Sequence, residues 1–162
     1  MPVFISHRTR DDEIARKVWG YLYHHHHISC YIDDFDEIAR IAGNTNCITA
    51  RILERLEDCT HLLALVTKNT RGSWWVPFEV GVARRAPRVI STYTNLNDSD
   101  LPEYLKEWPI LRWSEELDEY AAFYHAYKDQ TDRLFQEVVR LPNQRELTEH
   151  VHLELKTRLN QT

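Results

Sequence analysis

The sequence predicts an α/β fold in which a parallel sheet of about five strands lies between two layers of helices. Short apolar runs alternate with segments of helical periodicity along most of the chain, which is the order of elements in such folds. The apolar runs are nearly continuous, as in strands that are buried on both faces. With 162 residues, of which 43% are hydrophobic and 28% charged, the chain is long enough to build one core of this kind.

Two strands and two helices are expected in the first part of the chain. Residues 3–6 form an apolar run that stops at polar side chains, which predicts a buried strand. Acidic residues then open a helix over residues 11–22, because negative charge is favourable at a helix N-terminus. We expect this helix to fray at the histidines 24–27. Residues 28–32 predict a second strand, and helical spacing after a polar loop predicts a second helix with Ile48, Ile52, Leu53 and Leu56 on its apolar face.

The middle of the chain continues the alternation. Residues 61–67 are apolar throughout and predict the clearest strand in the sequence. A helix follows, for which Ser73 is a suitable N-cap residue. Residues 87–93 predict a fourth strand, and residues 110–113 predict a short edge strand.

From residue 114 onward the pattern is helical, with an interruption at residues 141–143. We therefore expect a core domain over residues 1–113 and a C-terminal helical extension over residues 114–162 that packs on the same domain. Strands that alternate with helices are joined by right-handed crossovers. The economical arrangement is a flavodoxin-like three-layer fold with strand order 2-1-3-4-5 and extra C-terminal helices.

This strand order predicts where a ligand would bind. In open parallel sheets, ligands bind outside the carboxyl ends of the strands, at the point where the order reverses. Here that point lies between the first and third strands. The first strand would deliver Ser6, His7 and Arg8, and the third would deliver the loop over residues 67–75. Each of these side chains could contact a ligand. Ser6 could instead simply end the strand, and His7 and Arg8 could be solvated cations of the loop.

The helix after the third strand carries two side chains that are candidates for a binding or catalytic role. Trp75 and Glu79 are four residues apart, so they lie on one face of a helix. Small apolar residues follow Glu79, and a carboxylate at the edge of a buried element needs a partner. Glu79 could also be a solvated helix carboxylate, and Trp75 could be a structural support. Trp74 is expected to be a core residue, because aromatic side chains at a helix start usually pack.

Composition excludes several classes of function. The net charge of −5 gives no electrostatic argument for nucleic-acid binding. We find no secretion signal and no stretch that could span a bilayer, so a cytoplasmic protein without membrane partners is expected. The three cysteines, Cys30, Cys47 and Cys59, lack metal-type spacing. Adjacent histidines on a helix point in different directions, so no metal site is expected at residues 24–27.

Four stretches, in their order and spacing, resemble a bacterial Toll/interleukin-1 receptor (TIR) domain: Phe4-Ile5-Ser6-His7, Cys30-Tyr31-Ile32-Asp33, Ile52-Leu53 to Cys59, and Ser73-Trp74-Trp75-Val76-Pro77-Phe78-Glu79-Val80-Gly81. The resemblance covers residues 3–113 and implies the flavodoxin-like sheet. Many members of the family cleave the glycosidic bond of NAD with a glutamate in a Trp-x-x-x-Glu arrangement. Stand-alone bacterial members, such as those of the Thoeris anti-phage systems, make a signal nucleotide that activates a partner effector.

The resemblance assigns expected roles to individual residues. Glu79 would be catalytic, stabilising positive charge on the ribose, and Trp75 would form an aromatic wall beside the substrate. Ser6, His7 and Arg8 would contact ribose or phosphate oxygens. Asp33 and Phe35 belong to a loop that matches the position of the family's BB loop, which closes over the site and mediates self-assembly. NAD would then be the substrate, and no cofactor is expected.

Two other functions remain open at this stage. The first is a non-catalytic TIR module that assembles with other TIR domains, and the second is a hydrolase similar to nucleoside deoxyribosyltransferases. The Trp75–Glu79 pair favours the NAD-cleaving enzyme, because a scaffold does not need it. The sequence does not decide between a hydrolysed, a cyclic and a base-exchanged product.

Overall fold

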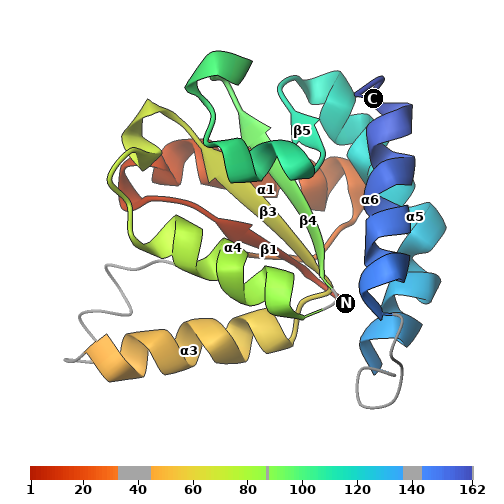
Figure 1. The fold of residues 1–162 in the computed structure, drawn as a ribbon, viewed down its shortest axis with the longest axis horizontal. Coiled ribbons are helices and arrows are strands. Elements are labelled where there is room, and N and C mark those ends of the chain that lie inside the picture. Colours follow the sequence, from red (N-terminus) through yellow and green to blue (C-terminus); the bar gives the residue numbers. More distant parts are fainter. Residues whose placement is uncertain (33–44, 87, 137–143, 162) are drawn as a thin grey trace.

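The central element of the fold is a five-stranded parallel sheet (Figure 1). A computed structural model describes the backbone of residues 1–32, 45–86, 88–136 and 144–161. The strand order β2-β1-β3-β4-β5 confirms the predicted flavodoxin-like arrangement, and all four strand pairings are parallel. The strands are β1 (Val3–Ser6), β2 (Cys30–Ile32), β3 (His61–Val66), β4 (Val89–Thr94) and β5 (Ile110–Leu111).

Helices cover both faces of this sheet. One face packs against α1 (Asp12–His26), α5 (Ser114–Gln136) and α6 (Gln144–Arg158), and the other against α3 (Thr45–Glu57) and α4 (Trp75–Arg85). Side chains of the central strand β3 alternate between the two cores: Leu63 and Leu65 join the first, whereas Leu62, Ala64 and Val66 join the second. Every residue of β3 is buried, as its apolar run predicts.

Short 3₁₀ turns connect several of these elements. They span Thr9–Asp11, Lys68–Thr70, Asp98–Asp100 and Glu103–Glu107. The first two lie directly after the carboxyl ends of β1 and β3, which pair with each other in the sheet. These two turns therefore meet at the predicted switch point.

The histidine run belongs to a well-formed helix, so the expectation that the helix frays there is wrong. Helix α1 continues to His26, and His27 ends it in the left-handed conformation with φ of 55°. The backbone N–H of His27 donates to the carbonyl of Tyr23 at 3.1 Å. His24 packs edge-on against Trp19 and Tyr23, and these aromatic contacts stabilise the last turn.

The C-terminal helices complete one of the two cores. Tyr120 and Phe123 of α5 and Val151 and Leu155 of α6 are buried in the same cluster as Val3 of β1. Residues 141–143, where the sequence predicts an interruption, lie outside the described residues.

Candidate active site

Ser6 and Glu79 meet at the carboxyl end of the sheet. Ser6 is the last residue of β1, and Glu79 lies on α4, which follows the neighbouring strand β3. The Ser6 hydroxyl donates a hydrogen bond to Oε2 of Glu79. Both side chains have an exposed fraction of 0%, so Glu79 is not a solvated helix carboxylate. A carboxylate at such a depth requires hydrogen-bond partners, and Ser6 is one of them.

The two tryptophans at the start of α4 differ in their exposure to solvent. The N-cap position of α4 is held by Trp74 and not by Ser73 as expected, although Oγ of Ser73 accepts a hydrogen bond from the backbone N–H of Val76 at 3.5 Å. Trp75 is half-buried against the core and contacts Phe78 edge to face, with 6.0 Å between ring centroids. Trp74 is 88% exposed, so its interpretation as a core residue is wrong. It precedes the buried face of α4, which begins at Val76.

His7 is buried beside the start of α1. Its Nε2 lies 3.5 Å from Oδ1 of Asp12. Burial lowers the pKa of His7 below its usual value of 6.5, although the neighbouring Asp12 carboxylate acts in the opposite direction. His7 is therefore a neutral ring at pH 7, and it faces Asp12 across the loop that follows β1.

Arg8 joins two loops of the candidate site. Its Nη1 donates to the backbone carbonyl of Asn69 and, at 3.0 Å, to that of Arg71. These carbonyls belong to the connection between β3 and α4. The guanidinium thus ties the end of β1 to the loop that leads into the helix of Glu79.

A buried network around Asp11 holds the same two loops together, and sequence reasoning missed it. Oδ2 of Asp11 accepts from the Thr67 hydroxyl at 2.8 Å, and Oδ1 accepts from the side-chain amide of Asn69 at 2.6 Å. The Thr67 hydroxyl in turn accepts from the backbone N–H of Asn69 at 3.0 Å. The only sequence signal was an acidic residue before a helix, which we interpreted as a favourable interaction with the helix dipole.

We expect Asp11→Ala to lower the free energy of unfolding by about 3 kcal/mol, since the buried hydroxyl of Thr67 and the amide of Asn69 lose their acceptor. Urea unfolding followed by tryptophan fluorescence measures the loss. Asp129→Ala, at an exposed carboxylate on α5, is the matched control and should change stability by less than about 0.5 kcal/mol. Equal stabilities of the two variants would contradict the assigned role of the network.

Other candidate residues fall outside this constellation. Asp33 and Phe35 lie outside the described residues. Burial raises the pKa of the Cys30 thiol to about 12, so this cysteine is protonated at neutral pH. Across the part of the chain that the structure describes, no group of three or more histidine, cysteine, aspartate or glutamate side chains could hold a metal ion.

Comparison with known families now identifies the fold. A family model described as TIR domain matches residues 3–135. The chain belongs to the TIR domain family. The match extends past residue 113, where the motifs resembling the family end, and includes most of α5 of this TIR protein. Among curated proteins, none matches the chain at a significant level.

The family includes members that cleave NAD and members that act as scaffolds, and TIR domains self-associate. Within the described ranges, no helix combines the length and the apolar character that crossing a bilayer requires. In this TIR protein, the carboxylate of Glu79 and the hydroxyl of Ser6 form a hydrogen-bonded pair at the switch point of the sheet.

Proposed function

We propose that this TIR protein cleaves the nicotinamide–ribose bond of NAD and converts the remainder into a signal nucleotide, either cyclic or base-exchanged, in anti-phage defence. The nucleotide would diffuse to a downstream effector, as the resemblance to stand-alone members implies. One observation carries this proposal. A buried carboxylate, Glu79, is hydrogen-bonded by Ser6 at the position where open parallel sheets bind their ligands.

The proposed chemistry matches the groups at the site. When the C–N bond breaks, its electron pair leaves with nicotinamide, and positive charge spreads over the ribose carbon and ring oxygen. A carboxylate close to that ring stabilises the charge, as carboxylates do in glycoside hydrolases. Ser6 would orient the Glu79 carboxylate, and the half-buried ring of Trp75, one turn earlier on α4, would contact the substrate. The acceptor that attacks next determines the product.

The closed geometry implies that the site must open before catalysis. Ser6 and Glu79 have no exposed surface, so a substrate reaches them only after surrounding side chains move. A trigger or an assembled state would supply that movement. We therefore expect little activity in the dilute protein and more activity when the protein is concentrated.

Incubation with NAD tests the proposal. Nicotinamide release is followed by chromatography, and the second product is identified by mass as hydrolysed, cyclic or base-exchanged. The protein is assayed over a wide range of concentrations, with and without a crowding agent that promotes assembly. A parallel incubation with a deoxynucleoside tests for deoxyribosyltransferase-like hydrolysis. Absence of nicotinamide release under every condition would exclude the proposed activity.

A second candidate function is a non-catalytic interaction module. The complete burial of Glu79 and Ser6 favours it, because a structural carboxylate–hydroxyl pair has no need of access to solvent. Concentration-dependent self-association without consumption of NAD would support this module. Self-association accompanied by nicotinamide release would support the enzyme.

A further inference from the structure

An ion pair joins the loop before α4 to an acidic turn at the carboxyl end of the sheet. This acidic turn, Asp98–Asp100, follows β4, and the loop over residues 67–74 follows the neighbouring strand β3. In that loop, Nη2 of Arg71 lies 3.0 Å from Oδ1 of Asp100, and both side chains are exposed. The loop that leads into the helix of Glu79 is therefore tied to the end of β4.

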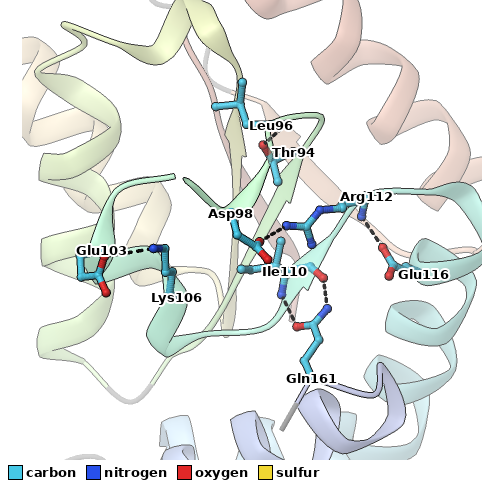
Figure 2. A network of polar contacts seen from close by, with 9 residues as sticks. All are labelled: Thr94, Leu96, Asp98, Glu103, Lys106, Ile110, Arg112, Glu116 and Gln161. Carbon is cyan, nitrogen blue, oxygen red and sulfur yellow. Dashed lines mark hydrogen bonds and ion pairs between the residues drawn. The ribbon is translucent and has the colours of Figure 1, made fainter. Parts of the chain in front are cut away.

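The acidic turn itself is attached to the sheet. Nη2 of Arg112, directly after β5, donates to Oδ1 of Asp98 (Figure 2). The backbone N–H of Arg112 donates to the carboxylate of Glu116. The side-chain amide of Gln161 bonds to both backbone groups of Ile110 in β5, and its Oε1 accepts from that N–H at 2.9 Å. The turn is thus held in place independently of its bond to Arg71.

The loop around Arg71 is less firmly packed. Arg71, Gly72 and Trp74 are exposed, and Trp74 reaches 88%. Gly72 has a φ of 78°, a conformation that favours glycine, and no heavy atom of the described residues lies within 4 Å of where its Cβ would be. Segments with little buried apolar surface open at a low free-energy cost. Residues 71–74 can therefore move about Gly72 without disturbing either core.

Arg71 lies at the rim of the candidate active site. Its backbone carbonyl accepts from Nη1 of Arg8 at 3.0 Å, and Arg8 comes two positions after Ser6. The loop of Arg71 then enters α4, which carries Glu79 in its second turn. The guanidinium of Arg71 is thus connected on one side to the strand of Ser6 and on the other to the helix of Glu79.

We propose that the Arg71–Asp100 ion pair is an autoinhibitory contact, in which Asp100 occupies the guanidinium that binds a phosphate of the substrate. The inference rests on the proposed function for its ligand, because one phosphate of NAD is attached to the ribose whose bond is cleaved. Arginine binds phosphate with two parallel hydrogen bonds, whereas an exposed ion pair contributes little to stability. A nucleoside diphosphate therefore replaces Asp100. The exchange frees the loop before α4, which is a step toward exposing the buried Glu79.

Calorimetric titration with ADP tests this exchange, and adenosine serves as the ligand that lacks phosphates. Asp100→Asn frees Arg71 and should bind ADP about tenfold more tightly than the native protein does, the effect of one hydrogen bond between charged groups. Glu103→Gln is the matched control, because it removes the same charge from an exposed ion pair with Lys106 that also measures 3.0 Å. It should bind ADP like the native protein. Adenosine should bind equally to all three proteins.

Removing Arg71 as well shows whether this side chain causes the gain. A double variant of Arg71→Gln and Asp100→Asn should bind ADP no more tightly than Arg71→Gln alone. The inference is overturned if Asp100→Asn binds ADP no better than the native protein, including the case in which neither binds it. It is also overturned if Glu103→Gln shows the same gain or if the double variant keeps it. ADP lacks the bond to nicotinamide, so absence of nicotinamide release would count against the proposed reaction alone.

Discussion

Glu79→Gln is expected to reduce the rate of nicotinamide release from NAD by about 100-fold or more, the usual loss when one preorganised electrostatic group is removed. Glutamine has the shape of glutamate, and its oxygen can still accept from the Ser6 hydroxyl, so the packing of α4 is retained. What is lost is the negative charge that would stabilise the ribose cation. Initial rates at saturating NAD measure the effect.

Glu119→Gln provides the matched control, since Glu119 is an exposed carboxylate on α5. It should keep the native rate. Thermal unfolding of both variants establishes that the fold is intact. A native rate in folded Glu79→Gln would remove Glu79 from the catalytic role, even if the protein cleaves NAD.

Ser6→Ala separates orientation of the carboxylate from its charge. The variant keeps Glu79 but removes the hydroxyl that donates to Oε2. We expect the rate to fall about tenfold, because losing a hydrogen bond that contributes about 1.4 kcal/mol to the transition state lowers the rate by that factor. A loss as large as that of Glu79→Gln would instead assign Ser6 a role in the chemical step.

Acid is expected to destabilise the protein mainly through its buried histidines, among which burial lowers the pKa of His61 to about 3 and that of His152 to about 4. His61 at the start of β3 is completely buried, and its Nδ1 lies 2.9 Å from the Thr60 hydroxyl. Burial, together with the N-terminal ammonium and His152, lowers the pKa of His61 to about 3. In the described part of the chain no hydrogen-bond partner faces its Nε2. The folded protein therefore has no favourable place for a second proton on this ring.

The direction of the pH effect follows from this lowered pKa. Above about pH 6.5 the ring is neutral in both the folded and unfolded chains, and the stability is complete. As the pH falls from 6.5 towards 3, the unfolded chain takes up a proton that the folded chain excludes. His61 then costs up to about 5 kcal/mol of stability, at about 1.4 kcal/mol for each pKa unit. His152 acts in the same direction down to its pKa of about 4.

Urea unfolding between pH 7.5 and pH 4.5 measures this dependence. His61→Asn should be less stable than the native protein at pH 7.5 but should lose less stability on acidification. His25→Asn, at an exposed position of the histidine run, should keep the native pH dependence. An unchanged slope in His61→Asn would show that other groups govern the acid response.

The sequence by itself determined the strand order and the buried strands of this TIR protein. Residues 62–66 are apolar at every position, and such a run is typical of a strand that is covered on both faces. Alternation with helices then allows few parallel topologies. Topology also placed the end of β1 beside the start of α4, where Ser6 and Glu79 meet.

Only the tertiary structure decided which polar groups bond to one another. Asp11 and Thr67 are 56 residues apart, and Gln161 and Ile110 are 51 residues apart. No local pattern marks such pairs, because they depend on how separate loops and helices meet in space. The same holds for Trp74, because it precedes α4 and helical periodicity does not determine the direction of its side chain. Local periodicity therefore specified the layers of the fold, whereas hydrogen bonds between residues far apart in the sequence joined the loops of the site to each other and the C-terminal segment to the sheet.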